Sequence, residues 1–178
     1  MNLSSKAKSE YKLQSYAASP TIEGVSWSEL RRFNDAGGSM MELLRFESLP
    51  DAGLADFTPR QLNYSILHPG VIKAFHLHKR QTDVWFVPPE DRVLLVLVDV
   101  REGSPTEGVQ QSLMLGDGNS RWIRVPPGVA HGCRNLGEAD ARILYLTDVT
   151  FDADPSRCDE GRLPWDYVGA DVWEIPNE

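Results

Sequence analysis

Hydrophobic residues along the chain form short runs, and clusters of turn-forming residues separate these runs. Residues 61–66 alternate polar and apolar side chains, which is typical of a strand with one buried face. Gly, Pro, Asn and Asp gather between the runs, as at residues 68–70, 116–119 and 126–128. Because no long segment with helical periodicity lies between the runs, the pattern predicts an all-β sandwich or barrel. The other strand-like runs are residues 40–46, 71–78, 84–87, 93–100, 109–115, 122–125 and 141–149.

The N-terminal part of the chain lacks this pattern. Residues 1–20 are polar and aperiodic, so we expect a lead-in that precedes the fold. Ser26 and Glu29 have the spacing of a helix capping box, which predicts a short helical turn over residues 26–30. The remaining length, residues 21–178, suits a single domain with a C-terminal tail from about residue 152.

Composition and charge narrow the class of protein. The 178 residues include 18 Lys and Arg against 26 Asp and Glu, a net charge of −8, which is the wrong sign for a general nucleic-acid surface. The longest apolar run, residues 93–98, is too short to cross a bilayer, and the N-terminus lacks the apolar segment of a secretory signal. Having only Cys133 and Cys158 argues against a disulfide framework. We therefore expect a cytoplasmic protein with neither a nucleic-acid nor a membrane partner.

Three of the four histidines share a pattern that points to chemistry. His76 and His78 stand two apart in a predicted strand, so their side chains lie on the same face. His131 follows a proline–glycine turn in the pattern P-x-G-x-x-H-x-x-x-N over residues 126–135, which resembles the second motif of the cupins. This resemblance implies a cupin-type double-stranded β-helix, a jelly roll. His68 lies in a turn and is interpreted as structural.

A metal site is one interpretation of these histidines. Metal cupins hold a divalent ion with histidines and a glutamate, ligands that suit iron, manganese, nickel or zinc. In this chain His76, His78 and His131 would serve, and Asp83 stands at the carboxylate position with a shorter side chain. A metal-dependent cupin enzyme therefore stays open.

A longer stretch, from about residue 33 to residue 166, resembles the dTDP-4-dehydrorhamnose 3,5-epimerase family of sugar-nucleotide cupins. The motif Q-x-N-x-S is intact at residues 61–65, and V-D-x-R-x-G-S-P-T-x-G is intact at residues 98–108. The family's A-H-G turn and its L-Y pair are present at residues 130–132 and 144–145. The motifs follow one another in the family's order.

The resemblance implies proton transfer on a nucleotide-linked 4-keto-6-deoxy sugar. The keto group acidifies the neighbouring C–H bonds, and inversion of a carbon needs acid–base groups on opposite faces of the ring. His76 stands at the position of the family's base, and Tyr145 stands at the position of its acid. The family needs no cofactor, and its members are usually homodimers. The resemblance also implies a set of substrate-binding residues, namely Gln61, Asn63, Lys73, His78 and His131.

Several positions depart from the family pattern. Lys73 and Gly37 each replace an arginine, and Asp83 stands where the family has a pocket lysine. Leu95 replaces an aspartate. No S-x-K-D segment follows residues 160–166, which resemble the family's E-x-x-I-x-W-x-D, so the carboxylate that supports the base is expected to be missing. These changes would weaken the parent chemistry.

The departures leave the reaction open. Single epimerisation is one alternative, and the H-x-H-K sequence at residues 76–79 resembles that of sugar 3,4-ketoisomerases. A non-catalytic cupin that binds a sugar is another alternative. Two features have structural interpretations, since Asp99 and Arg101 form a pair near a turn and Cys133 is a small core residue.

Overall fold

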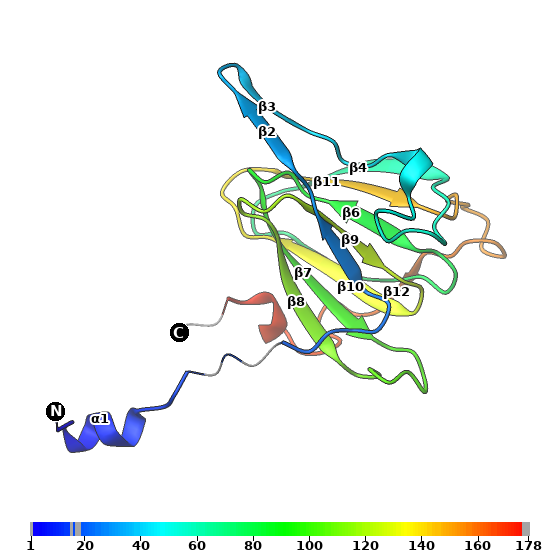
Figure 1. Cartoon of the computed structure of the whole chain (residues 1–178). Helices are drawn as coiled ribbons and strands as arrows, with labels where there is room; N and C mark the ends of the chain where they lie inside the picture. The colour runs from blue at the N-terminus through cyan, green and yellow to red at the C-terminus, as the bar shows by residue number, and fades with distance from the viewer. Residues whose placement is uncertain (1, 15, 17–18, 176–178) are drawn as a thin grey trace.

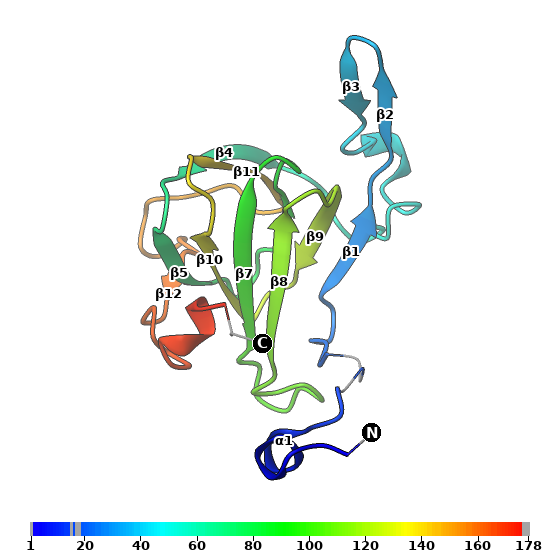
Figure 2. The same cartoon turned by 90° about the vertical axis from the view of Figure 1, so that its left-hand side faces the viewer.

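A computed structural model describes residues 2–14, 16 and 19–175. In this part of the chain two five-stranded antiparallel sheets face each other, and a two-stranded hairpin projects from them (Figures 1 and 2). The first sheet has the order β1 (Ser26–Glu29), β9 (Arg121–Val125), β6 (Asp83–Phe86), β11 (Ala141–Thr147) and β4 (Gln61–Leu67). The second sheet has the order β12 (Gly161–Arg162), β5 (Ile72–Leu77), β10 (Val129–Asn135), β7 (Arg92–Asp99) and β8 (Gln110–Gly116). The remaining elements are the hairpin strands β2 (Arg32–Asp35) and β3 (Gly38–Met41), helix α1 (Ser5–Glu10), and the 3-10 helices η1 (Phe46–Ser48) and η2 (Asp171–Trp173).

This arrangement confirms the predicted all-β jelly roll. Strands that are far apart in the sequence are neighbours in each sheet, since β4 pairs with β11 and β5 pairs with β10. The predicted strand over residues 71–78 corresponds to β5, and the one over residues 93–100 corresponds to β7. Strand periodicity is therefore a sound guide to the core of this fold.

Strand β7 explains the longest apolar run in the sequence. Leu95 packs into the core between the two sheets, whereas Val96 packs on the outer face of the second sheet. The C-terminal segment covers this outer face, where Trp173 is fully buried against Phe75. Because β7 is buried on both faces, its residues do not alternate with polar ones.

Two predictions of local structure are wrong. Residues 26–30 do not form a helical turn, because Ser26–Glu29 is strand β1 and pairs with β9. A single helical turn is unstable in water, and the hydrogen bonds of the sheet prevail over the capping-box spacing. The run at residues 40–46 is a strand only as far as Met41, because Leu44 packs against the outer face of the first sheet instead of extending the hairpin.

Helix α1 was not predicted. The Ser4 hydroxyl accepts a hydrogen bond from the Ala7 backbone at 3.3 Å, which caps the helix, and none of the six helical residues is buried. A short polar helix has no apolar stripe, so periodicity cannot detect it. Across the part of the chain that the structure describes, no helix combines the length and the apolar character needed to cross a membrane.

Candidate active site

A cavity of about 460 Å³ opens between the two sheets. Both sheets and the C-terminal segment contribute to its walls, and most of the lining side chains are polar or ionisable. The lining residues are Ser65, Lys73, His76, His78, Gln81, Asp83, Trp85, His131, Cys133, Ile143, Tyr145, Glu160 and Arg162. The fold therefore brings together both residues predicted to be catalytic and most of those predicted to bind substrate.

Strand register places the histidines in this cavity. His76 on β5 and His131 on β10 are directly opposite each other, and their rings stack with centroids 5.8 Å apart. The ring of His78 lies 5.4 Å from that of His131. The two strands approach closely because position 132 is a glycine, where a Cβ atom would collide with Ala74. The glycine of the A-H-G turn thus lets the strands bring the imidazoles together.

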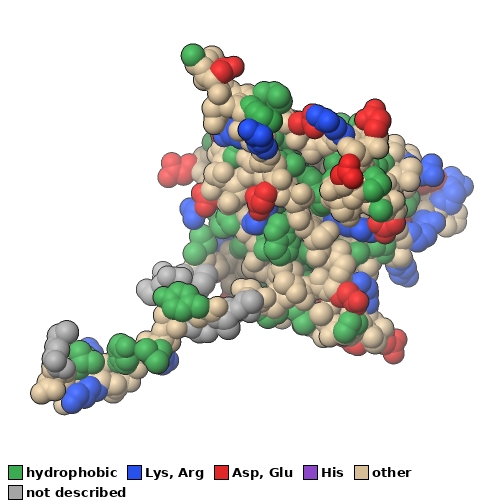
Figure 3. Space-filling view, viewed as in Figure 1, with side chains coloured by type: hydrophobic (Ala, Val, Ile, Leu, Met, Phe, Trp, Pro, Cys, Tyr) green, Lys and Arg blue, Asp and Glu red, His purple; other side chains and the backbone are tan. Residues whose placement is uncertain are grey.

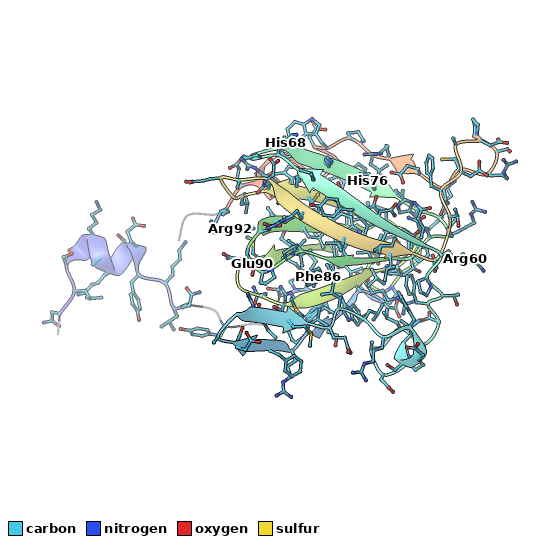
Figure 4. All side chains as sticks on the ribbon, turned by 90° about the horizontal axis from the view of Figure 1, so that it is seen from above. Arg60, His68, His76, Phe86, Glu90 and Arg92 are labelled. Carbon is cyan, nitrogen blue, oxygen red and sulfur yellow. The ribbon has the colours of Figure 1, made fainter. Side chains whose placement is uncertain are left out.

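His68 lies outside the cavity. Figure 4 shows it near the turn that precedes β5, whereas His76 lies further along that strand. The His68 Nδ1 is 2.8 Å from Asp140 Oδ1, and the His68 side chain is 74% exposed. This placement agrees with the structural interpretation of His68.

A carboxylate and a guanidinium hold the ring of His76. The His76 Nδ1 donates to Glu160 Oε1 at 2.5 Å, and Arg162 Nη1 donates to His76 Nε2 at 2.9 Å. The two contacts together require a proton on Nδ1 and a lone pair on Nε2. Strand β12 and the residue before it, Glu160, bring both partners to the site, because Arg162 pairs with His76 in the sheet. The base position therefore has a carboxylate neighbour, and the expectation that it lacks one is wrong.

Burial and charge keep His76 neutral near neutral pH. Burial lowers the pKa of His76, and the charges of His131 and Arg162 lower it further, which together outweigh the raising effect of Glu160. The hydrogen bond from His76 lowers the pKa of Glu160 in spite of its partial burial. An unprotonated imidazole beside an ionised carboxylate is the arrangement that a general base requires.

Asp83 forms hydrogen bonds with Gln81 and Trp85 inside the cavity and is almost completely buried. Gln81 Nε2 donates to Oδ1 of Asp83 at 2.7 Å, and Trp85 Nε1 donates to Oδ2 at 3.0 Å. Burial alone would raise the pKa of Asp83, but the interaction with His131 and the charge of His78 outweigh this effect and lower it. The pocket lysine of the family is thus replaced by an ionised carboxylate that has hydrogen-bond partners.

Among the residues that the structure describes, two groups of side chains could hold a metal ion. These are His76, His78 and Glu160, and the buried His78, Asp83 and His131. In the buried group, Nδ1 of His78 donates to the Asp159 carbonyl at 2.7 Å, and Nδ1 of His131 donates to the Val129 carbonyl at 3.1 Å. Metal-bound histidines usually have such a carbonyl partner on the other ring nitrogen. The Nε2 atoms of both rings therefore remain available to an ion, although the Gln81 amide lies 3.3 Å from that of His78.

Tyr145 lines the cavity from the sheet opposite His76. The Tyr145 ring lies 5.9 Å from that of Trp85 on the neighbouring strand. Burial raises the pKa of Tyr145, and the negative charges of Asp83 and Glu160 raise it further. The phenol therefore keeps its proton near neutral pH, as a proton donor must.

Of the remaining predicted binding residues, Gln61 and Asn63 lie on strand β4, and Lys73 lies on strand β5. Lys73 lines the cavity, and its Nζ donates to the Ile66 carbonyl at 3.0 Å and to the Ser65 hydroxyl at 3.4 Å. Gln61 and Asn63 are not among the cavity residues, and their side chains bond to each other at 2.7 Å. The cavity thus includes one end of the Q-x-N-x-S motif, Ser65, but not its first two polar side chains.

Among the charged and amide side chains of the cavity, the sequence did not point to Glu160, Arg162 or Gln81. Glu160 begins the stretch that resembles the E-x-x-I-x-W-x-D segment, and this was the only signal for it. Arg162 occupies a position that the motif leaves free. Both lie in an irregular part of the chain, where no period predicts which side chain faces the cavity.

Two other sequence features have structural roles, as predicted. Asp99 Oδ1 accepts from Arg101 Nε at 2.8 Å, and Asp99 Oδ2 accepts from the Ser104 and Thr106 hydroxyls at 2.6 Å each. The Arg101 bond and these hydroxyls hold the pKa of Asp99 well below its usual range. Burial raises the pKa of Cys133 to about 12, so its thiol is not a nucleophile near neutral pH.

The fold and its pocket define a cupin-type jelly roll with a polar cavity of the size that small molecules occupy. The chain belongs to the dTDP-4-dehydrorhamnose 3,5-epimerase family, whose model matches residues 19–166. The names in this family indicate 3,5-epimerase activity on sugar nucleotides.

Individual relatives agree with this assignment. The chain is 39% identical over 145 residues to the spore coat polysaccharide biosynthesis protein SpsL of Bacillus subtilis (strain 168). The matched region covers 82% of this chain and 91% of SpsL. The crystal structure of dTDP-4-dehydrorhamnose 3,5-epimerase from Bacillus anthracis str. Ames, with TDP and PPi bound, matches with a TM-score of 0.73 and 26% identity, over 88% of this chain and 91% of that one. NovW, a 4-keto-6-deoxy sugar epimerase from Streptomyces spheroides, matches with a TM-score of 0.74 and 26% identity, over 88% and 78% of the two chains.

Proposed function

We propose that the protein is an epimerase or isomerase of a nucleotide-linked 4-keto-6-deoxy sugar, with His76 as the base and Tyr145 as the acid. One observation carries the proposal: the His76 imidazole, held by Glu160, lines one side of a cavity that the Tyr145 phenol lines from the opposite sheet. The cavity volume of about 460 Å³ lies in the range of about 300–1,000 Å³ that is usual for small-molecule sites.

The chemistry follows from the two protonation states. Nε2 of His76 takes the proton from a carbon next to the keto group, and the C–H electrons form the enolate. The carboxylate of Glu160 stabilises the imidazolium that results. Tyr145 returns a proton to the same carbon from the other face, which inverts it. Exchange with water then resets both residues, so solvent hydrogen enters the sugar.

The identity of the sugar nucleotide rests on the relatives. NovW is a 4-keto-6-deoxy sugar epimerase, and the Bacillus anthracis enzyme holds TDP and PPi. In a chain with a net charge of −8, a diphosphate needs a local cation, and Lys73 lines the same cavity. A cytoplasmic location is part of the proposal, and the free thiols of Cys133 and Cys158 suit a reducing compartment.

Deuterium wash-in tests the proposal. The protein is incubated with dTDP-4-keto-6-deoxyglucose in D₂O, and deuterium at C3 and C5 is followed by NMR. We expect incorporation at one or both carbons, which also distinguishes single from double epimerisation, and its loss in His76→Asn. His68→Asn is the matched control and should exchange like the wild type, because His68 lies outside the cavity. Absence of exchange in the wild type with several nucleotide-linked 4-ketosugars would overturn the proposal; tight binding without exchange would instead indicate a non-catalytic sugar-binding cupin.

We also propose that the protein is a homodimer. Leu62, Tyr64 and Ile66 alternate along the outer face of β4 and are 64%, 60% and 45% exposed. Contiguous apolar side chains of this kind usually mark an interface. Figure 3 shows, on the face seen in Figure 1, hydrophobic side chains exposed among charged ones. Light scattering should give twice the chain mass, and Tyr64→Lys should shift the protein toward the monomer; a monomeric wild type would contradict this proposal.

A metal-dependent reaction in the same pocket is the second candidate function. Nε2 of His131 lies 3.5 Å from Oδ2 of Asp83. Two ligands of a tetrahedral zinc ion, each about 2.1 Å from it, lie about 3.4 Å apart, so the buried group of His78, Asp83 and His131 fits an ion. A divalent ion there would polarise a substrate carbonyl. Elemental analysis decides between the two candidate functions. About one metal ion per chain, lost in His131→Gln, would support the metal-dependent reaction. A metal-free protein that catalyses deuterium exchange would exclude the metal-dependent reaction.

A further inference from the structure

Arg162 has no role in the proton transfer described above, although it touches the base. We propose that Arg162 covers the proton-accepting nitrogen of His76 in the empty pocket and moves to the carbonyl oxygen of the bound ketosugar, where it stabilises the enolate. This inference rests on the proposed function and adds a third catalytic residue to it.

His76 has one ring nitrogen that can accept a proton. Nδ1 is bonded to Glu160, so only Nε2 can take a proton from the substrate. Arg162 Nη1 donates to this lone pair at 2.9 Å. A guanidinium has donors only and stays charged, so it cannot take a proton in place of His76. His76 can therefore act as a base only after Arg162 has left Nε2.

The Arg162 side chain can move without leaving the site. Its side chain is 57% exposed, compared with 24% for His76. Its guanidinium is also 3.4 Å from Glu160, between Nη2 and Oε1, which is a loose ionic contact. Its backbone is fixed, because Arg162 pairs with His76 in the two-residue strand β12 at the edge of the sheet. The guanidinium therefore stays within reach of the base after it releases Nε2.

The enolate needs a cation beside His76. The keto oxygen lies two bonds from the carbon that loses its proton, so a donor beside the base is also beside that oxygen. The cavity walls carry two carboxylates, Asp83 and Glu160, which oppose the new negative charge. Of the Lys and Arg residues in the lining, Lys73 is bonded to the Ile66 carbonyl on the opposite sheet. Arg162 is the one next to His76, and it can offer two N–H groups to an oxyanion.

Atoms and electrons balance in this step. The proton passes from carbon to Nε2 of His76, the C–H electron pair becomes the C=C bond, and the carbonyl π pair moves to oxygen. Arg162 changes hydrogen-bond partner from nitrogen to oxygen and transfers no proton. Neither an oxidant nor a co-reactant is needed.

Two measurements on Arg162→Ala and Arg162→Lys test the inference. The first is an NMR titration of the His76 ring without substrate. Burial, His131 and Arg162 lower the pKa of His76 while Glu160 raises it, so removal of the Arg162 charge should raise this pKa. The second is deuterium wash-in with dTDP-4-keto-6-deoxyglucose. We expect kcat to fall about 100- to 1,000-fold in Arg162→Ala with little change in KM, and to recover in part in Arg162→Lys.

Arg157→Ala is the matched control. Arg157 belongs to the same C-terminal segment, but its guanidinium is bonded to Asp152 and does not line the cavity. It should leave both measurements unchanged. Wild-type exchange that persists at full rate in Arg162→Ala would overturn the inference and leave the proposed function intact. Absence of exchange in the wild type would overturn both. An unchanged His76 pKa in Arg162→Ala would show that the guanidinium does not cover the base.

Discussion

Glu160 and His76 lie 84 residues apart in the chain and meet through a hydrogen bond of 2.5 Å between Oε1 and Nδ1. The carboxylate comes from the tail, and the imidazole comes from the barrel wall. The pair gives the imidazole of His76 a carboxylate partner from a distant part of the sequence.

Glu160→Gln should lower the rate of deuterium wash-in about 100-fold or more, because a neutral amide does not stabilise the imidazolium that forms during proton removal. The exchange rate under saturating substrate gives this number. Glu102→Gln, at an exposed position outside the cavity lining, is the control. A Glu160→Gln protein that keeps the wild-type rate would show that the carboxylate only packs against the ring.

The pH dependence follows from the two pKa shifts. The pKa of His76 is lowered from 6.5, and the base works only when it is unprotonated, so the rate should rise through a midpoint below pH 6.5 and then level off. The pKa of Tyr145 is raised from 10.0, so the alkaline decline should begin only above that value. A profile of kcat/KM from pH 4 to 11 measures both limbs. An acid midpoint above 6.5 would contradict this assignment.

Tyr145→Phe should separate the two halves of the reaction. His76 can still remove a proton and return a solvent deuteron to the same face, so wash-in should continue. Inversion needs a donor on the other face, so formation of the epimer should fall about 100-fold or more. NMR detects the two outcomes in one sample. Equal loss of exchange and inversion would argue that the phenol also helps to form the enolate.

The hydrogen bonds of Asp99 should contribute to the stability of the fold and not to the rate of the reaction. Asp99→Asn should lower the free energy of unfolding by about 2–4 kcal/mol, because a buried carboxylate with an arginine and two hydroxyl partners is lost. The pKa of Asp99 is lowered on folding, so its contribution is present above about pH 4 and is lost as the solution becomes more acidic. Urea unfolding at pH 7 and pH 3 measures this effect.

The control for this experiment is Asp117→Asn, a half-exposed carboxylate that lies 3.7 Å from Arg92. Such surface pairs contribute less than about 1 kcal/mol. Equal effects of the two variants, or an Asp99→Asn deficit that is as large at pH 3 as at pH 7, would show that the Asp99 network is not the source of the stability.

The barrel and three of its histidines could be predicted from the sequence for physical reasons. Strand period places His76 and His78 on one face, and the proline–glycine turn directs His131 into the same cavity. The helical turn at residues 26–30 was wrong because a capping box is a local signal, whereas β1 forms through contacts with a strand almost a hundred residues away. The sequence of an edge strand does not indicate which strand it pairs with.

The contacts of Glu160 and Arg162 could not be predicted in this way. They depend on two residues of β12 pairing with β5, in a segment without periodicity. The resemblance to the family suggested that the base lacks its carboxylate, because a resemblance compares positions in a motif. A carboxylate that reaches His76 from another part of the chain is visible only in three dimensions.

Strand β7 has no solvent-facing side, since the last part of the tail, with Trp173 at its centre, shields its outer face. A recombinant protein that ends before this tryptophan would expose Val96 and its apolar neighbours to solvent. Such an exposed apolar patch would make the shortened protein aggregate during expression. Affinity tags for purification are therefore better attached to the N-terminus, where α1 buries nothing.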